Sequence, residues 1–464
     1  MSVSLSELFR RDEPAMAVRG VHLDLKGTPP TFERLLRLLE VFEALRYNAV
    51  LVEWEDTFPW TADLRFRCET CYTPQQVVAF REKAAELGIE VVPLVQCLGH
   101  METPLSPPGY ERLREVPHQA DVLSPLAKGA RELVAGMVDD VLVAFPELRH
   151  FHLGGDEAWS FGTHPDTKAF IEAHGKGALY LHHVGPILDK LNERGIRPIL
   201  WHDMMKDWAP DALQSLAEKA DLCVWGYRGH PDNTPHHFNT KYIRRFADHG
   251  VPLWGATAYK GAGGHNVDVT DNAIHTENAL AWAEVAERFG MRGVFATAWS
   301  RYSTHNVHCE TIDASLDSLV NVAVILHDGE PPEGGIEACI EALGELGERE
   351  RFEACNTAMK KLADLREAGW RNVRHLREVV AMATIDARRR NGGHMVKTLG
   401  YLRNAVAEAD ALAADIRAAY AGLVEPIWID RYLAERIEPL RWELADLDAR
   451  LRLLDPPGHA ATFE

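Results

Sequence analysis

Two adjacent carboxylic acids, Asp156 and Glu157, close the segment HLGGDE at residues 152–157. The glycines before them allow a tight turn of the backbone. Carboxyl groups held close together perturb each other's pKa, so one can stay protonated while the other is ionised. An Asp-Glu pair is more often part of a solvated loop or a helix cap. Here it directly follows a strand-like apolar run, which favours general acid–base chemistry.

Aromatic side chains occur at the ends of the strand-like runs that come later in the chain. Trp201, Trp225 and Trp299 end such runs, and Tyr259 follows another. Each of them alone is more often part of a hydrophobic core than of a binding site. Four at the same end of successive runs would surround the two acids with apolar ring faces. Such faces stack on the C–H face of a sugar and keep water away from a developing cation.

The strand-like runs number eight, and amphipathic helices separate many of them. Most are almost continuously apolar, as is typical of parallel strands that are buried on both faces. Eight such units in about 310 residues predict an α/β fold, a (β/α)8 TIM barrel with its active site at the carboxyl ends of the strands. A doubly wound open sheet is the alternative, but the chain lacks a glycine-rich phosphate turn after the first run. The predicted strands are Val18–Leu25, Ala49–Glu53, Glu90–Gln96, His150–Gly154, Pro198–Trp201, Leu222–Gly226, Pro252–Ala258 and Gly293–Trp299.

Three predicted helices carry recognisable start signals. The helix over Thr31–Leu45 begins with a threonine that can cap it. Those over Pro74–Leu87 and Pro125–Ala144 have proline at the first position, after a threonine and a serine respectively. These helices follow the first, second and third predicted strands, as a barrel requires.

The domain organisation follows from where the strand signals end. We expect an N-terminal tail at 1–15, a catalytic barrel at 16–328 and an all-α domain at 336–464, with the glycine- and proline-rich segment at 327–335 as linker. In the last segment Pro439 should kink a helix or start it afresh. Leucine and isoleucine recur there at alternating steps of four and three, which is a heptad seam: Leu433, Ile437, Leu440, Leu444, Leu447, Leu451 and Leu454. Packing of a helical bundle against the barrel and homodimerisation through the seam both account for it.

Composition narrows the classes of partner. The 464 residues hold 50 Lys and Arg against 69 Asp and Glu, a net charge of −19, which argues against nucleic acid or an anionic membrane as partner.

No window approaches 18 uninterrupted apolar residues, and the N-terminus lacks the apolar core of a signal peptide. Seven cysteines are sparse, and the CxxC pair Cys68 and Cys71 has no second pair to complete a zinc ribbon. We therefore expect a cytoplasmic protein with reduced thiols.

Taken together, these motifs resemble the family 20 glycoside hydrolases, the β-N-acetylhexosaminidases. The segments HLGGDE, RGVHLDLKG at 19–27 and GHME at 99–102 are most similar to the hexosaminidase D branch. The resemblance covers about residues 15–325 and leaves out the C-terminal helical region. It implies an exo-acting, retaining enzyme that needs neither cofactor nor metal and acts on an amino-sugar glycoside.

The resemblance also implies roles for the central residues. Glu157 would be the general acid/base, protonating the glycosidic oxygen and then activating water. Asp156 would hold the substrate's own 2-acetamido group, whose carbonyl oxygen attacks the anomeric carbon to give an oxazoline, an exception to the two-carboxylate scheme. Tyr259 would hydrogen-bond the acetamido oxygen.

Further positions match substrate-binding residues of the family. Trp201, Trp225 and Trp299 would form the walls and floor of the acetamide pocket. Arg19, at the start of the first strand, would hold sugar hydroxyls, and His100 matches the histidine of the third loop.

This chain departs from the larger lysosomal and bacterial relatives at two places. Gln96 replaces an aspartate four residues before the histidine, and Arg301 stands where a glutamate is expected, with Glu310 as the nearest acid. These departures affect contacts to the sugar's 4- and 6-hydroxyls, so both GalNAc and GlcNAc remain candidate substrates, with the branch favouring galactosaminides. Asp203 is either an acid of the pocket or a helix cap.

Two readings compete with this interpretation. His305, His308 and Glu310, or His22 with Asp24, could form a metal site, although imidazoles at a barrel mouth are more often hydrogen-bonding partners. A sugar-binding barrel without turnover is the alternative from another functional class, and a glycosidase of different sugar specificity is the alternative among enzymes.

Overall fold

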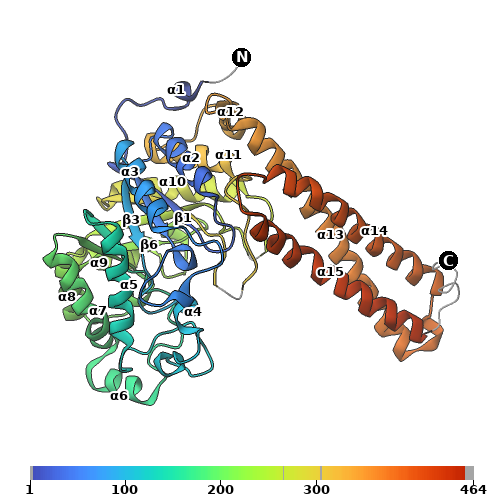
Figure 1. Cartoon of the computed structure of the whole chain (residues 1–464), viewed down its shortest axis with the longest axis horizontal. Coiled ribbons are helices and arrows are strands. Elements are labelled where there is room, and N and C mark those ends of the chain that lie inside the picture. The colour runs from blue at the N-terminus through green and yellow to red at the C-terminus, as the bar shows by residue number, and fades with distance from the viewer. Residues whose placement is uncertain (1–3, 265, 304–305, 455–464) are drawn as a thin grey trace.

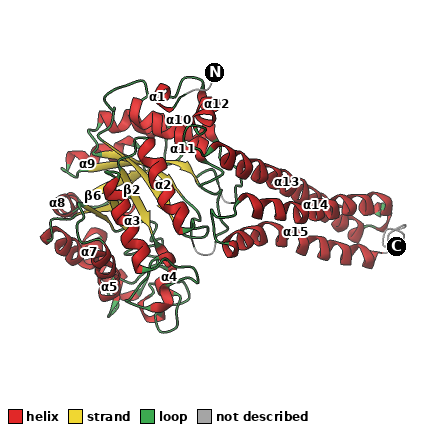
Figure 2. Cartoon of the chain, turned by 45° about the horizontal axis from the view of Figure 1, so that its top comes forward, coloured by secondary structure: helices red, strands yellow, loops and turns green. Residues whose placement is uncertain are grey.

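Eight parallel strands pair in sequence order and close into a barrel that helices surround (Figure 1, Figure 2). The computed structural model describes residues 4–264, 266–303 and 306–454. The last strand pairs with the first, Gly293 beside Val18, which confirms the predicted TIM barrel. The strands are β1 (Val18–Asp24), β2 (Ala49–Glu53), β3 (Glu90–Leu94), β4 (His150–His152), β5 (Arg197–Trp201), β6 (Asp221–Trp225), β7 (Leu253–Lys260) and β8 (Gly293–Ala298).

The interior of the barrel is a packed core. Leu51, Trp201, Trp254 and Phe295 belong to one buried cluster inside it. Gly20 of β1 faces Phe295 so closely that a Cβ atom there would lie 2.1 Å from the ring. Because side chains fill the barrel, a substrate can only enter at its mouth, where the loops after the strands meet.

Helices cover the outside of the barrel, and their buried faces form its main hydrophobic core. The Thr31 hydroxyl accepts a hydrogen bond from the Arg34 backbone N–H and caps the first of the long helices, as predicted. The helices up to the end of the barrel are α1 (Leu5–Leu8), α2 (Phe32–Ala44), α3 (Pro74–Glu86), α4 (Glu102–Leu105), α5 (Ala130–Ala144), α6 (Pro165–His174), α7 (Lys176–Glu193), α8 (Pro210–Lys219), α9 (Thr240–Asp248), α10 (Asn272–Arg288) and α11 (Leu316–Asp328).

One predicted helix starts later than expected. The prediction placed its first residue at Pro125, whereas α5 begins at Ala130. The Ala127 N–H donates to the Ser124 carbonyl in a tight turn, and Gly129 then adopts a left-handed φ of 99°. That conformation is incompatible with a continuing right-handed helix, so the proline marks a turn instead.

The C-terminal helices form an arm that projects from the barrel (Figure 1, Figure 2). They are α12 (Gly335–Ala342), α13 (Arg349–Ile385), α14 (Gly392–Ala419) and α15 (Pro426–Leu454). Ala338 and Cys339 of α12 pack with the core of the barrel, so the projecting arm consists of the last three helices. The helix α15 continues through Pro439 and does not start afresh there. None of the described helices combines the length and apolar character needed to cross a membrane.

The heptad seam of α15 is buried within the chain itself. Leu433 and Ile437 pack in a cluster with residues of α13 and α14, and Leu440, Leu447 and Leu451 pack in a second one. The seam therefore holds an intramolecular bundle. Homodimerisation through the C-terminal helices stays a prediction, and it would have to use a different face.

A buried ion cluster joins the arm to the loop after β7. Arg366 of α13 and Arg436 of α15 both donate to the carboxylate of Asp268. The Tyr432 hydroxyl lies 3.3 Å from the same carboxylate. All three charged side chains are at most 6% exposed, so the two guanidinium groups depend on one carboxylate for compensation.

We expect Asp268→Asn to lower the free energy of unfolding by about 3–5 kcal/mol, because it leaves two buried guanidinium groups without their carboxylate. Urea denaturation followed by circular dichroism measures the effect. Asp410→Asn removes the partner of Arg441 in an exposed ion pair and serves as the control, with an expected loss below about 1 kcal/mol. Equal losses for both variants would contradict the role of Asp268.

Candidate active site

A cavity of about 580 Å³ opens at the carboxyl ends of the strands. Its wall residues come from the loops after β3, β4, β6, β7 and β8, so the cavity lies at the mouth of the barrel. The residues lining it are His100, Glu102, Asp121, Asp156, Glu157, Trp159, Trp225, Tyr227, Arg228, Ala262, Gly264, Trp299, Tyr302, Ser303 and Asn306.

The loop after β4 presents the two acids through a turn that requires glycine. Gly154 and Gly155 have φ values of 55° and 81°. A Cβ atom on Gly155 would lie 2.1 Å from the Tyr180 hydroxyl, so no other residue fits there. Glu157 also has a positive φ, 45°, which is unfavourable for a residue with a side chain. Surrounding contacts must therefore hold this conformation in place.

His100 lies across the two acids. Its Nε2 is 3.6 Å from Asp156 Oδ2 and 3.4 Å from Glu157 Oε2. Burial opposes a charged imidazole, but the neighbouring carboxylates outweigh it and raise the pKa of His100 well above its ordinary value. Burial likewise raises the pKa of Asp156, against the lowering effect of His100. A protonated His100 thus compensates the charge that the two acids concentrate at this point.

Asp203 stabilises the loop after β4 that carries Asp156 and Glu157, which we call the acid loop. Its carboxylate accepts hydrogen bonds from the Glu157 backbone N–H at 3.0 Å and from Trp225 Nε1 at 3.4 Å. Burial, and then the charge of Asp156, raises the pKa of Asp203 to about 7. Asp203 is absent from the wall of the main cavity, so it acts as a positioning residue for Glu157 and Trp225.

Two of the predicted tryptophans line the cavity, together with a tyrosine that the sequence analysis missed. Trp225 stacks on Tyr227 with ring centroids 5.5 Å apart. Tyr227 in turn meets Trp299 edge-on at 6.3 Å. The missed signal was the WxY spacing, which places Tyr227 two residues beyond the end of β6, at the same mouth as Trp225.

Tyr259 does not reach the cavity, so its predicted contact with substrate is wrong. Its side chain is fully buried in the core outside the barrel, and its hydroxyl has no hydrogen-bond partner in the described part of the chain. Side chains alternate between the two faces of a strand. Trp254 and Ala256 of β7 point into the barrel, whereas Tyr259 lies at an irregularity of the pairing with β8 between Ala258 and Lys260 and packs in the outer core.

Arg19 is at the wrong end of the barrel for its predicted role. It is the second residue of β1, and the strand runs from there toward the mouth. Its guanidinium donates to the Met16 carbonyl at 2.6 Å and to the Arg46 carbonyl at 2.9 Å. Arg19 therefore closes the amino end of the barrel and cannot hold a sugar at the carboxyl end.

Trp201 lies beneath the cavity and does not line it. Its ring is buried inside the barrel, 4.2 Å from the His152 ring and 6.1 Å from that of Trp299, measured between centroids. It supports the tryptophan wall from below, which corrects the prediction that it contacts substrate.

Two residues after β8, Arg301 and Glu310, do not line the cavity. Glu310 is buried and accepts a hydrogen bond from the Gly261 backbone N–H at 2.7 Å, which stabilises the turn after β7. Arg301 is half-buried, and its charge acts on Glu55 and Asp56, whose pKa values burial raises. Contacts of Glu310 and Arg301 with substrate stay predictions.

The histidines considered as metal ligands have other surroundings. His308 Nδ1 lies 2.7 Å from Glu435 Oε2 of the arm, and His305 lies outside the described residues. His22 Nε2 faces Glu53 Oε2 at 3.7 Å. Within the described ranges, the cluster that could hold a metal ion is His230, Asp232 and Glu284 on the surface, away from the cavity wall.

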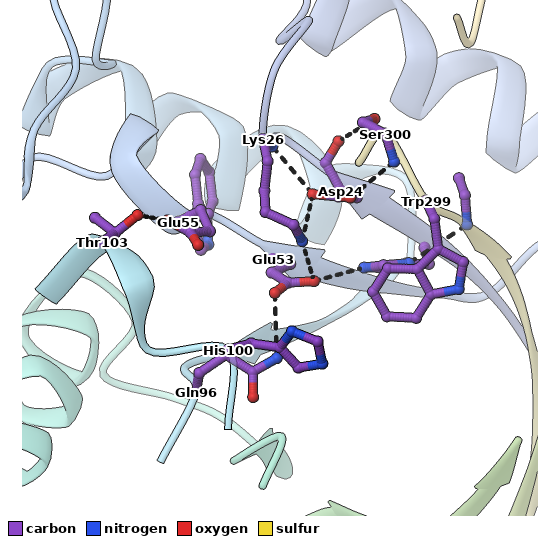
Figure 3. A network of polar contacts seen from close by, with 12 residues as sticks. Asp24, Lys26, Glu53, Glu55, Gln96, His100, Thr103, Trp299 and Ser300 are labelled. Atoms are coloured by element: carbon purple, nitrogen blue, oxygen red, sulfur yellow. Dashed lines mark hydrogen bonds and ion pairs between the residues drawn. The ribbon is translucent and has the colours of Figure 1, made fainter. Parts of the chain in front are cut away.

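A buried ion network supports the mouth of the barrel (Figure 3). Lys26 Nζ lies 2.9 Å from Asp24 Oδ1 and 2.9 Å from Glu53 Oε2, and 5.4 Å from the centroid of the Trp299 ring. Gln96 Nε2 donates to Glu53 Oε1 at 3.2 Å. The network thus joins the ends of β1, β2 and β3 to the tryptophan wall.

Gln96 also connects this network to the acids. Its Oε1 accepts a hydrogen bond from the Gly155 N–H at 3.2 Å. An amide side chain can donate to Glu53 and accept from Gly155 at the same time, which an ionised aspartate in this position could not do. The departure at Gln96 therefore has a structural role in this chain.

Two further acids line the cavity and were missed by the sequence analysis. Glu102, which is 7% exposed, follows His100 in the GHME segment, and Asp121 lies nearby. Burial raises the pKa of Glu102, against the lowering effect of His100. Asp121 Oδ1 is buried without a hydrogen-bond partner in the described structure. Both can accept hydrogen bonds from hydroxyl groups of a bound molecule.

Comparison with known proteins places this site in context. A model of the glycosyl hydrolase family 20 catalytic domain matches residues 19–242. Hexosaminidase D of Bos taurus is 33% identical over 322 residues, which are 67% of this chain and 92% of the relative. Hexosaminidase D of Homo sapiens is 32% identical over 323 residues, 67% of this chain and 66% of the relative.

Solved structures share the fold at lower identity. A chitobiase of Flavobacterium johnsoniae superposes with a TM-score of 0.56 at 15% identity, covering 97% of this chain and 78% of its own. A β-N-acetylhexosaminidase of Bacteroides fragilis gives a TM-score of 0.55 at 16% identity, covering 74% of this chain and 76% of its own. These likenesses concern the fold.

Asp203 makes the stability of the protein depend on pH in a defined direction. Its folded pKa of about 7 exceeds the ordinary value of 3.8, so between these values the folded protein keeps a proton that the unfolded chain has released. The free energy of unfolding of the wild type therefore falls, relative to that of Asp203→Asn, as the pH rises from 5 to 8, by about 1–3 kcal/mol. Urea titrations at the two pH values measure it, with Asp207→Asn as the control for an exposed neighbour. Parallel pH dependences of wild type and Asp203→Asn would contradict this role.

Proposed function

Because the chain belongs to glycoside hydrolase family 20 and is a glycoside hydrolase that acts on N-acetylhexosaminides, we propose that it removes terminal β-linked GalNAc or GlcNAc with retention of configuration. The observation that carries this proposal is the acidic pair, which a positive-φ turn holds at the cavity beneath aromatic walls. We propose further that the reaction is substrate-assisted, with the acetamido group of the sugar as nucleophile.

Glu157 is the proposed general acid/base. Its side chain is 32% exposed and lines the cavity, so it can reach the glycosidic oxygen of a bound sugar. In the first step it donates its proton to that oxygen while the bond to the anomeric carbon breaks. In the second step its carboxylate accepts a proton from the water that opens the oxazoline.

Asp156 is the proposed partner of the acetamido group. It is buried, and its Oδ1 atom has no hydrogen-bond partner in the described structure, so it is free to accept from the acetamido N–H. This contact orients the acetamido carbonyl toward the anomeric carbon, and the rate gain comes from that fixed proximity. Tyr227, in place of Tyr259, offers a tyrosine hydroxyl on the cavity wall.

Recognition of the sugar's outer hydroxyls is proposed for Glu102 and Asp121. Their carboxylates supply hydrogen-bond acceptors in place of the aspartate and the glutamate that Gln96 and Arg301 replace. GalNAc has an axial 4-hydroxyl group and GlcNAc an equatorial one, so the orientation that these acceptors favour decides between the two sugars. The family resemblance favours GalNAc. All seven cysteines are unpaired thiols, which supports the proposal that the enzyme works in the cytoplasm.

Chromogenic β-GalNAc and β-GlcNAc glycosides test the reaction directly. We expect the wild type to release the chromophore from both, and more rapidly from the galactosaminide. Glu157→Gln should lower kcat by about 10²–10⁴-fold, because the variant cannot transfer the proton. Glu172→Gln, in an exposed position on α6, is the matched control and should keep wild-type turnover.

Two outcomes would decide against this assignment. Full activity of Glu157→Gln would show that another group is the acid. Binding of both sugars without release from either, by folded wild-type protein, would leave a sugar-binding barrel.

A thiazoline analogue of the oxazoline tests substrate assistance. We expect it to inhibit the wild type competitively. Asp156→Asn should weaken its inhibition constant by about 10- to 100-fold, because a charge-assisted hydrogen bond to the ring nitrogen is replaced by a neutral one. Absence of inhibition of an active wild-type enzyme would be incompatible with the substrate-assisted route.

A further inference from the structure

A second cavity of about 280 Å³ lies on the other side of the acid loop. It shares Trp159 with the main cavity, and Trp159 is 77% exposed although it is a large aromatic residue. Asp203, whose carboxylate holds the Glu157 backbone, lines the second cavity as well. The two cavities are thus neighbours along the loop that carries the proposed general acid.

Aromatic rings form much of the second cavity. Trp208 and Tyr180 meet edge-to-face with centroids 5.2 Å apart, and Phe161 lies beside Tyr180 at 6.3 Å. His237 lies on the same wall, and its ring centroid is 4.2 Å from that of Trp225 in the main cavity. Tyr180, Trp208 and Phe161 are themselves buried, so the exposed ring of Trp159 at the entrance is the apolar face on which a sugar can stack.

Two lysines make this cavity less acidic than the main one. Lys176, the first residue of α7, and Lys206 line it, and neither forms an ion pair with a described residue. Asp207, exposed on the same rim, and the buried Asp203 are the acids that face them. The main cavity, by contrast, is lined by four carboxylic acids with Arg228 and His100 as its basic residues. Unpaired ammonium groups beside stacking surfaces suit a sugar that carries a negative charge.

We propose that the second cavity is the subsite for the leaving sugar and that it selects a sugar bearing a carboxylate or a sulfate group. The inference rests on the proposed function, because it requires that Glu157 protonate a glycosidic oxygen. The sugar on the far side of that oxygen must lie next to Glu157, and Ala158 and Trp159, the next residues of its loop, lead into the second cavity. Trp159 provides the stacking surface between the subsites, and the two lysines recognise the charge.

Matched disaccharides test this subsite in the full-length enzyme. The same β-linked N-acetylhexosamine is joined to glucose, to glucuronate or to glucose 6-sulfate, and kcat/KM is measured for each. We expect the wild type to favour at least one charged disaccharide over the neutral one. The double variant Lys176→Gln, Lys206→Gln should lower that charged-to-neutral ratio by about 3- to 10-fold, as expected for two partly exposed ion pairs. High salt should lower the ratio of the wild type in the same way.

Controls separate charge recognition from stacking and from general damage. Lys168→Gln removes an exposed lysine of α6 outside the second cavity and should leave the ratio unchanged. Trp159→Ala should lower kcat/KM for charged and neutral disaccharides alike, and so keep the ratio. The two charged disaccharides show whether the subsite takes the carboxylate, the sulfate or both.

Two results would overturn the proposal. One is a charged-to-neutral ratio near one for the wild type with both charged disaccharides, and the other is a preference that persists in the double lysine variant. If the wild type cleaves neither the disaccharides nor the chromogenic glycosides, it is the proposed hydrolase reaction that fails, which the chromogenic assay reports independently.

Discussion

The buried ammonium group of Lys26 is the charge on which the mouth of the barrel depends. Burial opposes that charge, yet the carboxylates of Asp24 and Glu53 raise the pKa of Lys26 above its ordinary value. Replacement of Lys26 by a neutral residue would leave the two buried carboxylates without their cation, which is strongly unfavourable. The Trp299 ring rests over the ammonium group on one side, and Gln96 extends the network to the acid loop on the other. The positions of the tryptophan wall and of the two acids thus depend on one cluster of buried charges.

The barrel and its acids could be predicted from the sequence because the signals are local. A strand buried on both faces must be apolar along its length, so all eight strands were found with their ends within two residues. The HLGGDE segment contains both the acids and the glycines whose positive φ values the turn requires. His100 lines the cavity from the loop that follows β3. In each case the neighbours along the chain determine where the residue lies.

Residues whose direction depends on register could not be placed in this way. Tyr259 and Tyr227 both follow apolar runs, but Tyr259 lies where the pairing of β7 with β8 becomes irregular, and its side chain packs in the outer core. Arg19 lies in β1, whose carboxyl end contributes to the site, but it is near the amino end of that strand. Glu102 lines the cavity from the short helix α4, which is too short to give a periodic pattern in the sequence. These positions follow from the closed sheet and become visible only when its register is known.

The packing partner of the C-terminal arm also could not be predicted from the sequence, and the arm stabilises part of the site. A heptad seam has one period whether its partner is another chain or another helix of the same chain, so the sequence left both readings open. In the folded chain the seam packs α15 against α13 and α14. Arg436 and Glu435 of α15 then contact the loops after β7 and β8. Those two loops supply Ala262, Tyr302 and other wall residues of the cavity. The arm therefore stabilises the loops after β7 and β8, while the Lys26 network joins the ends of β1, β2 and β3 to the acid loop, so segments far apart in the sequence support the same cavity.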